Sequence, residues 1–317
     1  MATPSFGNGL QKEVQREREG KMQQTSLAFR RKKSIAVAST VFLFPALLVI
    51  AIFIIYPIID SFATSAYDWN GITDKLFVGF GNWKEMFHDK VFWKAFGNNL
   101  IVMVLSICIQ MPIGIALATW LDKVGRKGNV AKVIWFIPML MSSVAIGYLF
   151  RYALDANTGF VTGLSQLFGG GRVDLLGNPG KVLLTCIFII SWQFTPFYMV
   201  YYLAGYSGLS EDVKEAAMID GATERQYFWR VALPLLKPTI KSAVILSMVG
   251  SLKYFDLVYV LTKGGPSHAS ELMATYMYSM AFESHRNGYA STLACGMFIL
   301  ISLIAIVTMR LLNRKED

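Results

Sequence analysis

Long stretches without a charged residue constrain this chain more than any other feature of its sequence. A membrane-spanning helix needs about 20 predominantly apolar residues to cross the hydrocarbon core of a bilayer. Four charge-free stretches meet that length: residues 34–59, 98–121, 182–210 and 287–309. A fifth, 132–151, is bounded by Lys132 and Arg151, whose long side chains can reach the membrane surface. A sixth, about 240–262, is apolar except for two charged residues.

These stretches predict an all-α integral membrane protein with six transmembrane helices. We place the spans at about 34–59, 98–121, 132–151, 182–206, 240–262 and 288–310, within a membrane domain of residues 34–312. The composition agrees, because only 16% of the residues are charged, whereas soluble domains carry about 25%. The polar segment 1–33 is too long for the leading part of a signal peptide, so the first span is expected to stay uncleaved.

The distribution of basic residues predicts which side of the membrane each loop occupies. The two terminal segments and the loops after the second and fourth spans hold 20 of the 30 Lys and Arg residues, and the opposite loops hold 9. Because cytoplasmic loops carry the excess of Lys and Arg, the tails 1–33 and 313–317 are both expected in the cytoplasm. The net charge of +9 is therefore interpreted as a topology signal and not as a nucleic-acid-binding surface.

The cytoplasmic loop of residues 208–238 is polar and strongly punctuated, although it lies between two spans. Its central part, residues 215–238, reads EAAMIDGATERQYFWRVALPLLKP. Gly221 follows a short helical pattern and suits the left-handed residue that ends a helix. Thr223 and Gln226 have the spacing of a capping box, which starts a second helix. These signals predict two helices joined by a sharp turn, which together make a rigid elbow.

The two expected helices of this loop differ in character. The first has mostly small residues on one face, and the second carries an apolar stripe before two prolines end it. The stripe consists of Phe228, Val231, Ala232 and Leu235, and the prolines are Pro234 and Pro238. An ordinary loop would not need such local agreement, and a helix lying on lipid would carry Lys and Arg opposite bulky apolar residues. A docking surface for another protein is therefore favoured.

The same stretch resembles the signature of permease subunits in binding-protein-dependent ABC importers. The family pattern is E-A-A-x3-G-x9-I-x-L-P, and the chain departs from it only at Val231, which replaces isoleucine. The resemblance implies the MetI-like permease architecture, in the cytoplasmic membrane of a prokaryote, with the elbow as a coupling helix that docks on a separate ATPase subunit. The coupling residues that it implies are Glu215, Ala216, Ala217, Asp220, Gly221, Leu233 and Pro234.

Two further motifs narrow the resemblance to carbohydrate importers. The segments FDLVYVLTKGGP (255–266) and NGYASTLA (287–294) are similar to the first of the two permeases in maltose- and oligosaccharide-type systems. By itself the Gly-Gly-Pro run predicts only a turn after the fifth span. The resemblance implies ATP-driven, inward transport of an oligosaccharide, disaccharide, polyol or glycerol phosphate by alternating access. The implied partners are a second permease, two ATPase subunits and an extracytoplasmic solute-binding protein.

Polar and aromatic groups within the spans are candidates for the substrate path. Such groups are costly in lipid and usually face the protein interior, where aromatic rings can stack on sugar rings and amides can bond sugar hydroxyls. The candidates, most of them implied by the resemblance to maltose-type permeases, are Gln193, Phe194, Phe197, Ser247, Gly250, Ser251 and Tyr254. For Ser247, Gly250 and Ser251, close helix packing explains the residue types equally well. Phe194 and Gly250 depart from the family's residue types, which leaves the sugar open.

Lys253 and Asp256 are the two charged residues within the fifth span. At a spacing of i and i+3, they would lie on one helical face, where they can pair. Mutual neutralisation is favoured over substrate binding, because charges inside a membrane usually pair with one another.

No catalytic, cofactor or metal site is expected in this chain. The nearest approach to a phosphate-binding loop, residues 177–182, lacks the spacing and the hydroxyl of G-x4-G-K-[ST]. ATP and magnesium are therefore assigned to the partner ATPase subunits. The alternative function is an ion-coupled secondary transporter or channel. That class often shows internal repeats and relay carboxylates, whereas the predicted spans contain one carboxylate, Asp256, and no clear repeat.

Overall fold

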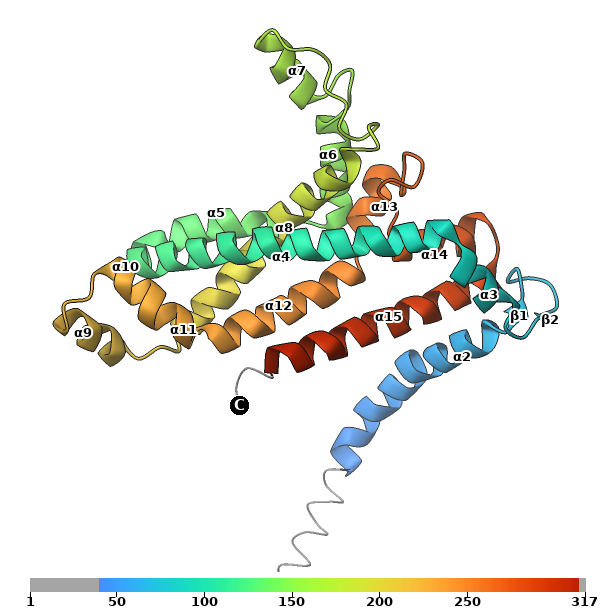
Figure 1. Ribbon diagram of the computed structural model, residues 1–317, viewed down its shortest axis with the longest axis horizontal. Helices are drawn as coiled ribbons and strands as arrows, with labels where there is room; N and C mark the ends of the chain where they lie inside the picture. The colour runs from blue at the N-terminus through green and yellow to red at the C-terminus, as the bar shows by residue number, and fades with distance from the viewer. Residues whose placement is uncertain (1–39, 314–317) are drawn as a thin grey trace, which may run out of the picture. The chain divides into compact units, whose positions relative to one another are not determined.

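The computed structural model describes residues 40–313, which are predominantly helical (Figure 1). The predicted N-terminal tail 1–33, residues 34–39 and all but the first residue of the tail 313–317 lie outside the described residues. The chain divides into two compact units, and the boundary between them in the sequence falls after Asp60.

The first predicted span is a helix over Thr40–Thr64. It contains a π-helical turn at Ala51–Ile55, which is followed by α2 at Tyr56–Thr64. Most of its large apolar side chains are exposed, as expected for a helix surrounded by lipid. A short antiparallel hairpin follows, with β1 at Tyr67–Asp68 and β2 at Leu76–Phe77, and α3 begins shortly after it at Gly81 and ends at His88.

Helices α4, α8, α12 and α15 form the centre of the second unit (Figure 1). The longest, α4, runs over Lys90–Val124 and begins at Asp89, whose carboxylate accepts hydrogen bonds from two backbone N–H groups of the first turn. It packs along α8 (Val182–Tyr206) and α12 (Lys237–Leu252). The last helix, α15 (Asn287–Asn313), packs against α12. These elements agree with the predicted second, fourth and sixth spans.

The third predicted span, 132–151, is not a continuous helix, which corrects the prediction. It consists of α5 (Asn129–Leu140) and α6 (Ser143–Ala153), which meet at an angle of 90°. The backbone is extended at the two intervening residues. Gln193 of α8 bonds this bend, because its Nε2 donates to the Met141 carbonyl oxygen at 3.4 Å and to Oγ of Ser143, the first residue of α6, at 3.1 Å.

The fifth predicted span, 240–262, is also interrupted. Helix α12 ends at Leu252, and α13 (Asp256–Thr262) begins after three non-helical residues. Asn99 of α4 stabilises this break, because its buried amide donates to the carbonyl oxygens of Ser251 at 3.2 Å and Leu252 at 3.3 Å. A buried carbonyl needs such a partner wherever a helix ends inside a protein.

This break also corrects the prediction for the two charged residues. Lys253 lies in the break and Asp256 is the first residue of α13, so they do not share a helical face. Both are exposed, and among the ion pairs of the described residues there is none between them.

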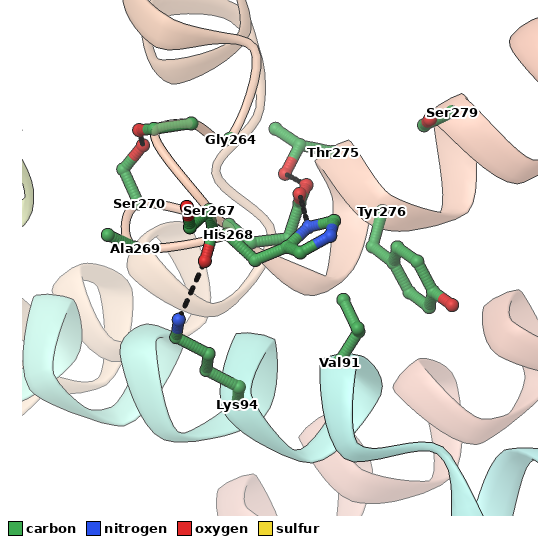
Figure 2. Close-up of polar contacts among 12 residues, drawn as sticks. Val91, Lys94, Gly264, Ser267, His268, Ala269, Ser270, Thr275, Tyr276 and Ser279 are labelled. Carbon is green, nitrogen blue, oxygen red and sulfur yellow. Dashed lines mark hydrogen bonds and ion pairs between the residues drawn. The ribbon is translucent and has the colours of Figure 1, made fainter. Parts of the chain in front are cut away.

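The turn predicted at Gly-Gly-Pro is present and opens a tightly bonded loop (Figure 2). Lys94 Nζ of α4 donates to the Ser267 carbonyl oxygen at 2.9 Å, and His268 Nδ1 lies 2.8 Å from Glu271 Oε2. The loop leads into α14 (Met273–Tyr278) and the π-helical turn Ser279–Glu283.

Four of the described helices are long and apolar enough to cross a membrane: Thr40–Thr64, Lys90–Val124, Val182–Tyr206 and Asn287–Leu312. The number rises to six when each of two bent helix pairs counts as one span. One pair is α5 with α6, and the other joins the helical segment Glu224–Leu235 to α12 at an angle of 65°.

Candidate substrate cavity and coupling elbow

A cavity of about 160 Å³ lies where α4, α8 and α12 meet beside the break in the fifth span. Its lining residues are Gln110, Ile190, Phe194, Tyr198, Ser247, Gly250, Ser251 and Tyr254. Hydroxyl, amide and aromatic groups predominate, and no charged side chain is among them. Hydroxyl and amide groups both donate and accept hydrogen bonds, so this lining suits an uncharged ligand with several hydroxyls.

The cavity brings together five of the seven residues predicted for the substrate path. They are Phe194, Ser247, Gly250, Ser251 and Tyr254. The rings of Phe194 and Tyr254 meet edge to face with centroids 5.8 Å apart, which is a favourable aromatic geometry.

The interrupted fifth span and the cavity occur at the same place. Tyr254 lies within the break and lines the cavity. Irregular backbone at membrane depth is tolerated only where it is buried in protein or lines a cavity. The break is therefore compatible with a membrane position, since Asn99 bonds its carbonyl groups on one side and the cavity lies on the other.

Gly250 distinguishes the cavity from ordinary helix packing. A Cβ atom built on this residue would meet nothing within 4 Å. A glycine that lets two helices approach closely would instead show a near contact, as Gly114 of α4 does against Tyr198 and Met199. At Gly250 the missing side chain leaves open space.

Gln193 and Phe197 do not line the cavity. The amide of Gln193 bonds the bend between α5 and α6, and its Oε1 accepts a long hydrogen bond from the Tyr254 hydroxyl at 3.4 Å. Phe197 stacks on Tyr201 and packs in the apolar cluster nearer the elbow. Any effect of Gln193 on a ligand would therefore pass through Tyr254.

Sequence reasoning missed three of the lining residues: Gln110, Ile190 and Tyr198. Ile190 carries no polar signal, and Tyr198 belongs to an aromatic run of α8 in which nothing marks one ring. Gln110 could have been predicted from the sequence, because it is an amide in the middle of the charge-free stretch 98–121, and polar residues within spans usually face the protein interior.

The predicted elbow is formed by residues 210–236, which we call the coupling elbow. Its first helix, α9 (Glu211–Ile219), begins at Ser210, whose Oγ accepts a hydrogen bond from the Asp212 N–H. Gly221 follows with φ +81°. The Gly221 N–H donates to the Met218 carbonyl oxygen, and the next N–H donates to that of Ala217, both at 3.0 Å. This is the hydrogen-bond pattern of a Schellman motif.

The second half of the coupling elbow starts with the predicted capping box. The Gln226 N–H donates to Thr223 Oγ1 at 3.3 Å, and the Thr223 N–H donates to Gln226 Oε1 at 2.7 Å. The helix runs through α10 (Glu224–Tyr227), a π-helical turn and α11 (Leu233–Leu235).

The structure corrects the apolar stripe predicted for this second half. Ala232 is buried, as expected, but Leu235 is 49% exposed. Tyr227 and Leu236 are buried in its place. The π-helical turn at 228–232 contains one residue more than an α-helical turn, so the side chains that follow it face a different direction from the one predicted. Pro234 lies within the last helical turn, and the helix ends at Leu235, the last residue of the predicted stripe.

The first helix of the coupling elbow is open to an additional partner. None of the nine residues of α9 is buried. Ala217 and Met218 pack against the apolar cluster of the bundle, whereas Glu215 and Ala216 are exposed. Ile219 is 85% exposed, which is unusual for a large apolar side chain in a polar loop. Small residues beside one exposed isoleucine suit close contact with another protein.

An ion pair ties the coupling elbow to the end of α4. Lys123 Nζ lies 3.0 Å from Glu224 Oε2, and this hydrogen bond holds the pKa of Glu224 below its usual value. Both side chains are about half exposed, so the pair contributes little to stability. It is a direct contact between the elbow and α4.

Comparisons with known proteins identify the family of this chain. Residues 110–317 match the family model described as the inner membrane component of binding-protein-dependent transport systems. The chain is 32% identical over 281 residues to the probable ABC transporter permease protein YurN of Bacillus subtilis, covering 87% of this chain and 96% of that protein. It is 29% identical over 280 residues to MsmF, a permease of the multiple sugar-binding transport system of Streptococcus mutans, covering 87% and 95% of the two chains.

A solved structure has the same fold. The crystal structure of a bacterial ABC transporter involved in import of the acidic polysaccharide alginate contains a chain that superposes with a TM-score of 0.78 at 24% identity. The superposition covers 90% of this chain and 99% of that chain.

The chain therefore belongs to the family of inner membrane components of binding-protein-dependent transport systems. It is a multi-pass membrane protein and an ABC transporter permease subunit. The family assignment gives no support to the alternative of an ion-coupled secondary transporter or channel.

Proposed function

We propose that this chain carries a carbohydrate inward by alternating access, as one permease subunit of an ATP-driven importer. The observation that carries the proposal is the cavity at the break in the fifth span, whose lining combines aromatic rings with hydroxyl and amide groups. Aromatic faces stack on sugar rings, and the polar groups match sugar hydroxyls. A relative that bears the name of a sugar transport system supports the same class.

The absence of charge in the lining favours some of the candidate substrates over others. A phosphate or carboxylate would enter this cavity without a lining counter-charge, which is costly. Oligosaccharides, disaccharides and polyols are therefore preferred over glycerol phosphates.

A second permease subunit would complete the site. Pockets for small ligands commonly have volumes of about 300–1,000 Å³, whereas this cavity has about 160 Å³. A site shared by two permeases explains the difference. Within such a pair, the motifs at 255–266 and 287–294 favour the position of the first permease for this chain.

The coupling elbow would receive the free energy of ATP hydrolysis from partner subunits. Glu215, Ala216, Ala217, Asp220 and Gly221 would form its contact with one of two ATPase subunits, supported by Leu233 and Pro234 in its second half. Both chain termini would share its cytoplasmic side. The outer loop after α13 lies at the other end of the helices, where a solute-binding protein would deliver the sugar.

Reconstitution tests this function directly. The chain would be placed in proteoliposomes with its partner permease, the ATPase subunits and the binding protein, and ATP hydrolysis would be measured with maltose, lactose and trehalose. Stimulation of hydrolysis by at least one sugar, together with sugar accumulation in the lumen, is expected. An assembled complex that hydrolyses ATP at the same rate with and without each sugar would contradict the proposal for neutral disaccharides.

A further inference from the structure

Gln110 is the one residue of α4 among those that line the cavity. The other lining residues belong to α8, to α12 or to the break that follows α12. Its side chain lies in the middle of a long apolar helix and is almost completely enclosed, with 3% of its surface exposed. A buried amide at such a position needs hydrogen-bond partners for both of its ends.

The protein supplies a partner for one end of this amide. Ser247 Oγ of α12 donates to Gln110 Oε1 at 3.2 Å. Among the hydrogen bonds of the described residues, none involves Gln110 Nε2. The amide oxygen and nitrogen of a glutamine can be assigned in either orientation. In both orientations Ser247 bonds one end of the Gln110 amide and the other end has no protein partner.

Two other buried amides on α4, those of Asn98 and Asn99, have hydrogen-bond partners for their nitrogen atoms. Asn98 Nδ2 donates to the carbonyl oxygens of Ala269 and Glu271, and Asn99 Nδ2 donates to those of Ser251 and Leu252. Neither asparagine lines the cavity. Gln110 differs from both, because the space beside its free end is the cavity and not a neighbouring backbone.

We propose that Gln110 is a substrate-contacting residue, whose free amide end hydrogen-bonds a hydroxyl group of an uncharged sugar or polyol. The inference rests on the proposed function and adds a third wall, α4, to a site that the sequence placed on the fourth and fifth spans alone. An amide end offers either two donors or two acceptors, and a sugar hydroxyl can meet either one. Ser247 positions the amide and competes for one end of it only.

The first test compares uptake by variants of the complete importer in proteoliposomes, with maltose, lactose and trehalose as substrates. Gln110→Leu, which keeps most of the side-chain volume but removes the amide, is expected to slow uptake by about 2- to 10-fold, the range for losing one hydrogen bond. Ser106→Ala is the matched control, because Ser106 lies one turn earlier on α4 and is also buried without a partner, but does not line the cavity. It should transport at the wild-type rate.

The second test separates ligand contact from a purely structural role. Gln110→Cys, in a chain whose exposed Cys108 is replaced by serine, should react with a small water-soluble methanethiosulfonate reagent. A transported sugar should slow that reaction at least several-fold. The corresponding Ser106→Cys variant should react slowly and without any effect of sugar.

The outcomes distinguish this inference from the function on which it rests. A wild-type importer that takes up none of the three sugars would contradict the proposed function for neutral disaccharides, and with it the inference for these sugars. If the wild type takes up a sugar but Gln110→Leu matches it, or if sugar gives Gln110→Cys no protection, only the role of Gln110 is overturned.

Discussion

At the scale of single residues, the cavity depends on one missing side chain and on a few polar groups. Gly250 leaves its wall open, and Ser247 holds Gln110 across the space between α12 and α4. Five of the seven predicted residues line the cavity: four were implied by the family resemblance, and Tyr254 was predicted as a polar aromatic group within the fifth span. Gln193 shows the limit of that reasoning, because sequence alone gives an amide's depth in the membrane but not the direction in which it points.

Gly250 provides a test of the cavity at low structural cost. Gly250→Leu would fill the open space with four carbons, and we expect it to reduce sugar uptake at least tenfold. The fold should survive, because an added Cβ meets no atom within 4 Å. Replacing glycine inside a helix also removes a helix-propensity penalty of about 1 kcal/mol. Uptake in proteoliposomes and the thermal midpoint of the purified complex are the two measurements.

Gly97 gives the matched control for this substitution. It lies on α4, and an added Cβ there also meets nothing within 4 Å, but it is not part of the cavity lining. Gly97→Leu should leave uptake within twofold of wild type. If both leucine variants transport normally, the cavity does not lie on the substrate path.

At the scale of elements, local signals predicted the coupling elbow well, and tertiary contacts determined the rest. The glycine at the end of α9 and the capping box are both encoded within a few residues of where they act. The interruptions of the third and fifth spans are not. Neither has a glycine or proline at the break itself, and both are stabilised by an amide from another helix, Gln193 in one case and Asn99 in the other.

The backbone conformation of the coupling elbow determines which substitutions at Gly221 should preserve its function. Its φ of +81° is unfavourable for a β-branched residue, although space is available for a Cβ atom. Gly221→Val should therefore reorient α9 at a cost of about 1–2 kcal/mol and abolish sugar-stimulated ATP hydrolysis. The protein should still insert in the membrane, because the residue lies outside the spans.

Asparagine at the same position is the control, because it adopts the left-handed conformation more readily than other residues with a Cβ. Gly221→Asn should retain most of the coupled hydrolysis and copurify with the ATPase subunit. Equal behaviour of the valine and asparagine variants would mean that backbone conformation at this turn is not what couples the subunits.

At the scale of the whole molecule, the coupling elbow connects the two helices that supply most of the cavity wall. Helix α8 carries Ile190, Phe194 and Tyr198 and ends at Tyr206, and α12 begins at Lys237 and carries Ser247, Gly250 and Ser251. The elbow is the connection between them. Movement of the elbow would therefore displace two walls of the cavity directly, while its ion pair with Lys123 connects it to the third wall, α4.

That arrangement requires the coupling elbow and the outer end of α6 to lie on opposite sides of the membrane, which thiol labelling can test. Ser207 is exposed in the turn after α8, and Leu167 is 78% exposed at the end of α7 (Phe160–Leu167), the helix that follows α6. In a chain with Cys108 replaced by serine, a membrane-impermeant maleimide should label Leu167→Cys in intact cells. It should label Ser207→Cys only after permeabilisation, because the excess of Lys and Arg predicts a cytoplasmic position for that turn. Labelling of Ser207→Cys in intact cells would reverse the topology and separate the elbow from any cytoplasmic ATPase.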